Sequence, residues 1–292
     1  MTVRTGGKDR RAMKLINGIE LPHIGFGTYK TGANCVDAVR EAVACGYRLI
    51  DTASVYGNER EVGEAVATCG TPREELIITT KAWRTQLGYD NVLRAFDQSM
   101  KKLKMDYADI YLLHWPARDY GVDRDSWRAM ERLYDEGLVK AVGVSNYLTH
   151  HLENLLANCR IRPVVDQLEL HPGYSQEAAV SYCKKNDVLP MAWSPLGRGR
   201  ENATIGNSIL VKLADRYGKS IQQINLRFLL QKGILPIPKA SSKEHMEANM
   251  KVFDFDLSDD DVMILSSMPQ NAWLGEHPDF FIPDRKSNPE NI

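Results

Sequence analysis

The sequence predicts an α/β fold, a (β/α)8 TIM barrel preceded by an N-terminal β-hairpin and ending in a C-terminal substrate loop. Short apolar runs alternate with amphipathic segments of helix length, as in a parallel sheet covered by helices. The ends of successive runs near residues 51, 81, 114 and 145 are separated by about thirty residues, the length of one βα unit. Eight such units favour a closed barrel over a doubly wound sheet.

The apolar runs place the expected strands at 24–26, 48–51, 76–81, 110–114, 141–144, 164–167, 188–193 and 234–237. Helices are expected at 36–45, 59–67, 91–102, 125–136, 150–158, 176–185 and 221–231, and a last one begins at Ser258. Asn58 precedes the second helix, and Glu61 is placed for a capping box there. The Asn17-Gly18 pair between short apolar runs predicts the hairpin over 15–21.

The chain is expected to hold one barrel domain over residues 13–292, after a polar and basic extension over 1–12. That extension lacks the apolar core of a secretory signal and is expected to be disordered. No apolar run reaches the roughly 18 residues needed to span a bilayer, so no membrane association is expected.

Charge and cysteine usage exclude several classes of function. The 37 basic and 38 acidic residues give a net charge of −1, with no positive excess for nucleic acid or an anionic membrane. The five cysteines are scattered and include no CxxC pair, which disfavours a disulfide framework or a zinc site and fits a reducing cytosol; they are Cys35, Cys45, Cys69, Cys159 and Cys183. A cytoplasmic monomer without a metal is therefore expected.

Ionisable residues stand at the carboxyl ends of three successive predicted strands: Asp51, Lys81 and His114. Tyr56 follows Asp51 in the loop on the same face. Each has a structural alternative, as a helix cap, a solvated lysine, a core histidine or a turn residue. In a barrel these strand ends share one mouth, where catalytic residues lie, so the four together predict an active site.

The chemistry of the four groups fits one reaction type. Tyrosine is a weak acid at neutral pH, and a nearby ammonium favours its phenolate form. Asp51 can hold Lys81, and His114 can orient a carbonyl oxygen. The set suits protonation of an oxyanion that forms as a carbonyl accepts a hydride. Neither Gly25-Phe26-Gly27 nor Gly197-Arg198-Gly199 completes a GxGxxG after a strand, so a nucleotide would be held in some other way.

The same residues resemble the aldo-keto reductase family, in particular bacterial members related to 2,5-diketo-D-gluconate and methylglyoxal reductases. The matching segments run in order from about residue 15 to 249, with Lys81 among them; they are 51–59, 112–116, 143–147, 167–172, 193–197 and 237–239. The resemblance implies that small aldehydes or ketones are reduced to alcohols by direct hydride transfer from NADPH, without a metal. It leaves NADH open as a second cofactor.

The resemblance also implies residue roles. Tyr56 would be the general acid, Lys81 and Asp51 would tune it, and His114 would orient the carbonyl. The implied cofactor residues are Gly27, Thr28, Asp51, Ser145, Asn146, Gln167, Trp193, Ser194, Leu196, Gly197, Lys239, Ser241, His245 and Asn249. Of these, Ser145, Asn146 and Gln167 would bind the carboxamide, Trp193 would stack on the nicotinamide, 194–197 would border the pyrophosphate, and Lys239 and its neighbours would bind the 2′-phosphate. The implied substrate residues are Tyr29, Tyr56, Trp83, His114, Trp115 and Trp273.

One segment departs from the family pattern. Many relatives that prefer NADPH carry Arg six residues beyond the lysine of the Ile-Pro-Lys motif, where this chain has His245. A histidine binds phosphate more weakly than an arginine, which can form two parallel hydrogen bonds to it. We therefore expect NADPH binding with weaker discrimination against NADH.

Two alternatives remain open at this level. One is a narrower ketone, keto-acid or steroid reductase, although the short loop over 116–123 predicts a pocket open to varied small carbonyls. The other is a non-catalytic NADPH-binding regulatory or structural subunit on the same fold, because function depends on the site and not on the fold.

Overall fold

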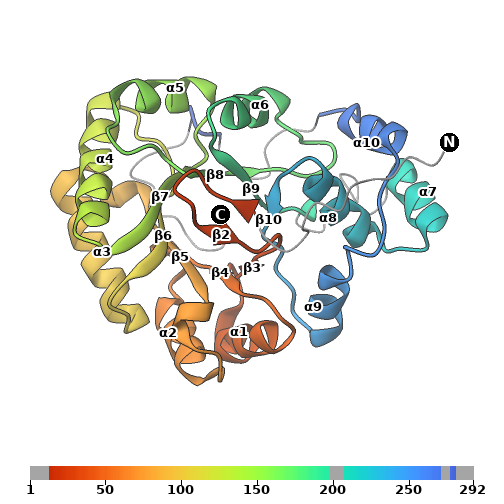
Figure 1. Cartoon of the computed structure of the whole chain (residues 1–292), viewed down its shortest axis with the longest axis horizontal. Coiled ribbons are helices and arrows are strands. Elements are labelled where there is room, and N and C mark those ends of the chain that lie inside the picture. The colour runs from red at the N-terminus through yellow and green to blue at the C-terminus, as the bar shows by residue number, and fades with distance from the viewer. Residues whose placement is uncertain (1–12, 198–206, 271–276, 281–292) are drawn as a thin grey trace.

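A parallel sheet of eight strands forms the centre of the computed structural model, which describes residues 13–197, 207–270 and 277–280 (Figure 1). Its strands are paired in sequence order; they are β3 Phe26–Gly27, β4 Leu49–Asp51, β5 Ile77–Ala82, β6 Ala108–Leu113, β7 Val139–Ser145, β8 Val165–Glu169, β9 Leu189–Trp193 and β10 Leu235–Pro236. Gly25 N donates to Pro236 O and Gly27 N donates to Pro238 O, both at 3.0 Å. These bonds join the first and last strands, so the predicted closed barrel is confirmed.

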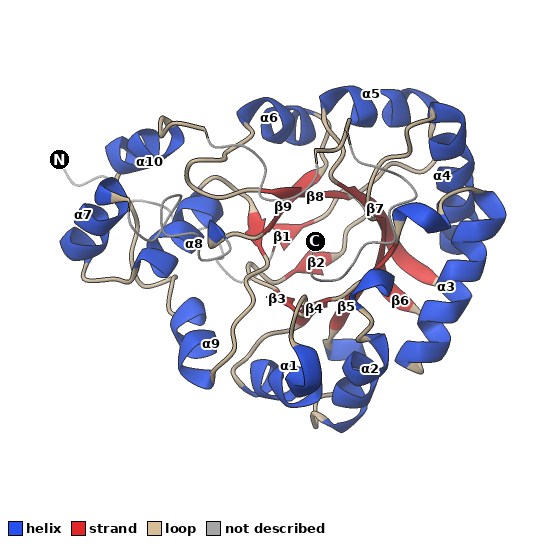
Figure 2. Ribbon diagram, turned by 180° about the vertical axis from the view of Figure 1, so that it is seen from behind, coloured by secondary structure: helices blue, strands red, loops and turns tan. Residues whose placement is uncertain are grey.

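Helices surround the strands on the outside (Figure 2). Six of them each follow one strand; they are α1 Cys35–Ala44, α2 Glu59–Thr68, α3 Tyr89–Leu103, α4 Tyr120–Asp135, α5 Thr149–Asn158 and α6 Glu177–Lys185. The rest lie around and after β10; they are α7 Ser208–Tyr217, α8 Ile221–Gln231, α9 Lys243–Met250 and α10 Asp259–Ser266. No helix in the described part of the chain is long and apolar enough to cross a bilayer.

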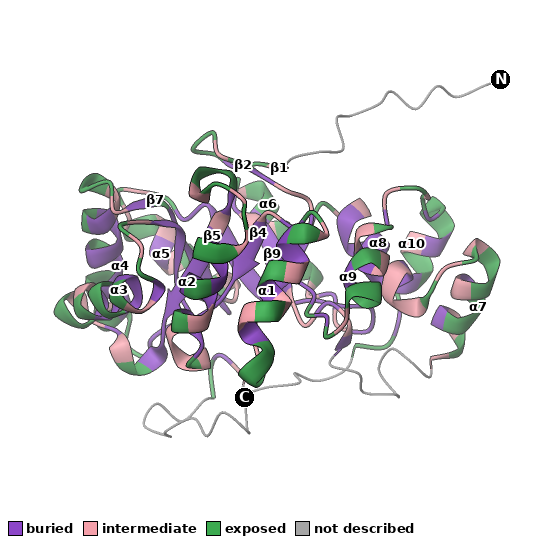
Figure 3. Cartoon of the chain, turned by 90° about the horizontal axis from the view of Figure 1, so that it is seen from below, coloured by how far each residue is buried: buried purple, intermediate pink, exposed green. Residues whose placement is uncertain are grey.

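The N-terminal hairpin closes one end of the barrel (Figure 3). β1, Met13–Lys14, pairs antiparallel with β2, Glu20–Leu21. Gly18 N donates to Leu15 O at 2.9 Å, and Gly18 adopts a φ of +88°. The turn is therefore a three-residue loop that needs a left-handed residue where glycine stands. Leu15 and Leu21 pack into the apolar cluster inside the barrel.

The core has two layers, one inside the barrel and one between strands and helices. The outer layer includes several large buried aromatic side chains, among them Phe96, Trp127 and Phe228. Because the hairpin and the inner apolar cluster fill the end where the strands begin, the carboxyl ends are left for polar chemistry.

Several local predictions need correction. The capping box at Asn58 is wrong, since no side chain caps α2. Asn58 instead accepts from Thr52 Oγ1 at 2.8 Å and donates to Thr28 O at 2.9 Å, because tertiary partners occupy its amide. Helix α4 begins at Tyr120, five residues before the expected start at 125, with the Asp119 carboxylate accepting from the N–H of Gly121.

The sequence patterns did not predict α7 and α9. α7 is capped by Asn207 and buries only Leu210 and Leu213. α9 buries only Met246 and Asn249, so its sequence lacks an apolar stripe that would mark it as a helix. Residues 1–12, expected to be disordered, and most of the expected substrate loop lie outside the described residues.

Candidate active site

The four predicted catalytic residues lie together at the carboxyl ends of neighbouring strands. Asp51 ends β4, Lys81 stands one residue before the end of β5, and His114 follows β6 directly. Tyr56 ends the short 3-10 helix Ser54–Tyr56 after β4. The parallel register of β4, β5 and β6 brings these ends to one edge of the barrel.

Lys81 and Asp51 form a buried ion pair. Lys81 Nζ lies 2.6 Å from Asp51 Oδ1 and donates to Thr52 O at 2.9 Å. Lys81 is fully buried and Asp51 is 3% exposed. Burial lowers the pKa of Lys81, and the Asp51 charge opposes that shift. Such a pair persists only when its remaining donors and acceptors are satisfied, and Gln167 Nε2 satisfies Asp51 Oδ2 at 2.8 Å.

Aromatic contacts hold Tyr56 between the lysine and the histidine. Lys81 Nζ lies 5.2 Å from the centroid of the Tyr56 ring. The Tyr56 ring meets His114 edge to face at 5.7 Å and Tyr29 at 5.0 Å. Trp83 also meets His114 edge to face, at 5.0 Å. The structure therefore brings the predicted acid, its cationic neighbour and the predicted carbonyl-orienting group into contact.

His114 is a neutral imidazole at physiological pH. Burial, followed by the positive charges of Lys81 and Arg84, holds its pKa well below the usual range. Within the described residues its buried Nδ1 has no hydrogen-bond partner. A neutral ring keeps one N–H donor and one acceptor, so His114 can donate to a carbonyl oxygen without competing for the proton of an acid.

The predicted carboxamide-binding residues form a connected polar network at the ends of β7, β8 and β9. Ser145 Oγ donates to Gln167 O at 2.7 Å, and Asn146 Nδ2 donates to His114 O at 2.9 Å. Trp193 Nε1 donates to Asn146 Oδ1 at 2.9 Å. Asn146 and Ser194 adopt left-handed φ angles of +63° and +49°, a conformation that costs energy in residues other than glycine and is frequent at functional sites.

The remaining predicted cofactor residues lie along two further loops. Thr28, which follows Gly27 of β3, donates through Oγ1 to Asp51 O at 3.0 Å. Leu196 and Gly197 follow Trp193 after β9. Exposed Lys239, Ser241 and His245 cluster in sequence around the beginning of α9, which Ser242 caps, whereas Asn249 is buried in its last turn.

Trp83 and Trp115 form a small apolar cluster with Val55, separate from the two core layers. Trp83 follows β5 and Trp115 follows His114, so both stand in the chain beside residues of the predicted catalytic set. The loop after His114 is short, because α4 already begins at Tyr120. Trp273, the other expected wall residue, lies outside the described residues.

Two residues at this edge were missed by the sequence patterns. Gln86 Oε1 accepts from Ser54 Oγ and from Trp83 N, both at 2.8 Å, and so fixes the loop beneath Tyr56. Arg84 is 7% exposed, and its guanidinium carbon lies 5.0 Å from the centroid of the Trp83 ring. A charged residue two positions after the end of β5 is the signal that could have identified Arg84.

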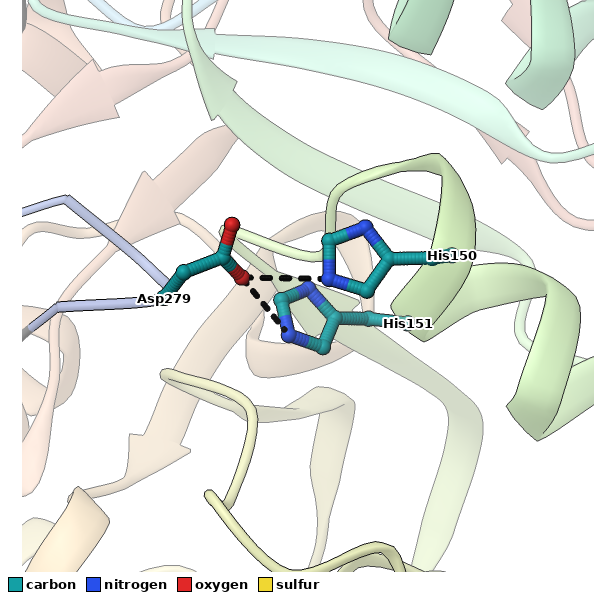
Figure 4. Close-up of side chains that lie close together, drawn as sticks. All are labelled: His150, His151 and Asp279. Atoms are coloured by element: carbon teal, nitrogen blue, oxygen red, sulfur yellow. Dashed lines mark hydrogen bonds and ion pairs between the residues drawn. The ribbon is translucent and has the colours of Figure 1, made fainter.

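His150, His151 and Asp279 form a cluster that resembles a metal-ligand set (Figure 4). His150 Nε2 and His151 Nε2 lie 3.1 and 3.3 Å from Asp279 Oδ1. However, His151 Nδ1 accepts from Leu148 N at 3.2 Å, whereas a metal-bound histidine normally donates its other ring N–H. Burial and His150 also lower the pKa of His151 to about 4. The neutral ring therefore carries its proton on Nε2 and donates to Asp279, which ties residues 277–280 to α5.

Ionisable side chains gathered at the carboxyl ends of a (β/α)8 barrel define a barrel enzyme. Comparison with known proteins gives its family: residues 23–268 match the model of the Aldo/keto reductase family, and the chain belongs to that family of oxidoreductases.

Individual relatives match over nearly the full length. The chain is 41% identical over 271 residues to a 9,11-endoperoxide prostaglandin H2 reductase of Trypanosoma cruzi, covering 92% of this chain and 95% of the relative. It is 40% identical over 269 residues to a glyoxal reductase of Bacillus subtilis, covering 91% and 96%. The crystal structure of a Bombyx mori aldo-keto reductase in complex with NADP superposes with a TM-score of 0.82 at 34% identity, covering 89% of this chain and 92% of that one.

Proposed function

We propose that this enzyme reduces small aldehydes and ketones to alcohols with NADPH, and that Tyr56 is its general acid. The observation that carries the proposal is the buried Lys81–Asp51 pair. Lys81 Nζ lies 5.2 Å from the centroid of the Tyr56 ring, and that ring also contacts the neutral imidazole of His114. A fixed cation beside a phenol, together with a neutral hydrogen-bond donor, suits an oxygen that gains negative charge during reaction.

Each side chain has a defined part in this mechanism. When bound, the reduced nicotinamide supplies the hydride that the carbonyl carbon accepts. The neutral His114 ring donates to the carbonyl oxygen and orients it. The Tyr56 hydroxyl gives its proton to that oxygen as the C–O double bond becomes a single bond, so the alcohol leaves neutral. Lys81 stabilises the tyrosinate that remains until solvent returns a proton, and Asp51 holds Lys81 in place.

The residues present fit a nicotinamide cofactor. Ser145, Asn146 and Gln167 bring hydroxyl and amide groups to the same edge as the catalytic residues, and Trp193 stands beside them with an aromatic face. Lys239, Ser241 and His245 place cationic and hydroxyl groups at the beginning of α9, where a helix favours an anion. The Bombyx mori relative holds NADP, which supports the same cofactor here.

We infer that NADPH is bound with less discrimination against NADH than an arginine would provide. His245 is exposed and in the first turn of α9. An imidazole offers a 2′-phosphate at most one ring N–H at a time, whereas a guanidinium offers a planar fork of donors. Measurable turnover with NADH is therefore expected.

The expected substrates are small aldehydes and α-dicarbonyls such as methylglyoxal. The short loop after His114 supports an open mouth on that side, and the apolar pair Trp83 and Trp115 supports an apolar wall. The Bacillus subtilis relative is named a glyoxal reductase, which supports this class. We further expect a monomer that acts in the cytoplasm, and gel filtration tests the monomer.

The test follows loss of reduced-cofactor absorbance with a panel of small carbonyls, with NADPH and NADH used separately. Tyr56→Phe removes the acidic proton and keeps the ring that contacts His114. We expect turnover by the wild type and a loss of about 100-fold or more in the variant. If NADPH binds but no carbonyl is reduced, a non-catalytic NADPH-binding subunit becomes the better interpretation.

A further inference from the structure

A buried carboxyl group near the candidate active site has no part in the mechanism above. Asp123 lies in the first turn of α4 and is 3% exposed. It does not cap that helix, because the side chain of Asp119 does so by accepting from Gly121 N. A buried carboxyl group is costly unless it is hydrogen-bonded, so the partners of Asp123 indicate what it holds in place.

One oxygen of this carboxyl group joins two loops at the carboxyl edge of the barrel. Asp123 Oδ1 accepts from Ala117 N at 2.7 Å and from the hydroxyl of Tyr147 at 3.0 Å. Ala117 stands three residues after His114, and Tyr147 directly follows Asn146. The carboxyl group therefore links the loop after the proposed carbonyl-orienting histidine to the segment that carries the proposed carboxamide-binding residues.

Asn146 adopts a backbone conformation that needs support from its neighbours. Its φ of +63° lies in the left-handed region, which a residue other than glycine keeps only where the surrounding structure fixes it. Its side-chain Nδ2 donates to His114 O at 2.9 Å. The next residue, Tyr147, is 1% exposed and is held at both ends, since its N donates to Asp166 Oδ1 at 3.4 Å and its hydroxyl donates to Asp123.

Deepening the proposed function, on which it rests, we propose that the Asp123–Tyr147 contact positions Asn146 and thereby sets the distance from the nicotinamide to the substrate carbonyl. Both side chains act through Asn146, whose amide is bonded to the backbone of His114. A reaction between bound groups requires close alignment, and a displacement of about 1 Å can slow it about 100-fold. The contact should therefore affect hydride transfer and leave cofactor affinity nearly unchanged, because it does not displace the phosphate-binding residues.

The experiment measures single-turnover oxidation of NADPH by the best substrate of the carbonyl panel, and the Kd of NADPH from quenching of tryptophan fluorescence. Tyr147→Phe removes only the hydroxyl that donates to Asp123. The matched control Tyr217→Phe removes a tyrosine hydroxyl that donates to Asp261 Oδ2 at 2.6 Å between α7 and α10. We expect Tyr147→Phe to slow hydride transfer by about 10- to 100-fold while the Kd stays within about threefold, and Tyr217→Phe to keep the wild-type rate.

Two further measurements separate positioning from stability. With deuterium as the transferred hydrogen, the isotope effect on kcat should be larger in Tyr147→Phe than in wild type, because hydride transfer limits the rate more fully. Asp123→Asn keeps an oxygen that can accept both hydrogen bonds, whereas Asp123→Ala removes it. The asparagine variant should therefore transfer hydride at least about tenfold faster than the alanine variant.

A wild-type rate of hydride transfer in Tyr147→Phe would overturn the inference, and so would an equal loss in Tyr217→Phe, which indicates a general effect on stability. If Tyr147→Phe does not fold, the two Asp123 variants decide, and equal rates in them refute the positioning role. The proposed function fails separately, if the wild type binds NADPH and reduces no carbonyl of the panel.

Discussion

Replacing Lys81 with methionine tests whether the buried ion pair serves catalysis, stability or both. The variant loses two buried hydrogen bonds, 2.6 Å to Asp51 Oδ1 and 2.9 Å to Thr52 O. Removing one partner of a buried ion pair costs about 3–5 kcal/mol, because the other charge remains uncompensated. Gln167 still donates to Asp51, so we expect a loss near the lower limit, about 3 kcal/mol.

The double variant Lys81→Met/Asp51→Asn separates the two roles. It removes the uncompensated carboxylate and should be at least about 1 kcal/mol more stable than Lys81→Met in denaturant unfolding. Activity should not recover with stability, because no cation remains beside Tyr56, and kcat should stay about 100- to 10,000-fold below wild type in both variants.

Two results would refute this reasoning. If Lys81→Met keeps kcat within about tenfold of wild type, the ammonium is not needed for proton transfer from Tyr56. If the double variant is no more stable than Lys81→Met, the buried Asp51 carboxylate is not the source of the destabilisation. The assays are guanidinium unfolding followed by tryptophan fluorescence and oxidation of NADPH by methylglyoxal.

The other predictions concern stability and cofactor choice. Burial raises the pKa of Asp123 to about 7, whereas an unfolded aspartate titrates near about 4. Wild type therefore loses stability as pH rises between these two values. Asp123→Asn should gain stability relative to wild type from about pH 4 to about pH 7 in urea melts, and a pH-independent difference would contradict the shift. Gly63→Ala should destabilise by about 1–3 kcal/mol in thermal unfolding, because its Cβ would stand 2.2 Å from Leu103 O; a neutral effect would mean that α2 moves freely. His245→Arg should raise the NADPH-to-NADH ratio of kcat/KM about tenfold or more, and an equal ratio would remove His245 from the phosphate site.

Local patterns were sufficient where the structure depends on local periodicity. The alternation of apolar runs and amphipathic segments predicted the barrel, because each strand must bury both faces and each helix one stripe. The hairpin at Asn17-Gly18 was predicted for the same kind of reason, since its turn depends on a few adjacent residues. The sequence patterns did not predict α9, because this polar helix is stabilised by the cap at Ser242 and by burial of Met246, and neither feature produces a periodic apolar stripe.

The sequence by itself determined the barrel and the set Asp51, Tyr56, Lys81 and His114, since parallel strands present their carboxyl ends to one mouth whatever their details. Only the tertiary structure decided how these groups are coupled. Gln167 reaches Asp51 across 116 positions of sequence, and His114 is neutral because burial and two cations surround it. Such couplings depend on register and on burial in three dimensions, which no local pattern encodes, and for the same reason the charge of Arg84 beside His114 became evident only in the folded chain.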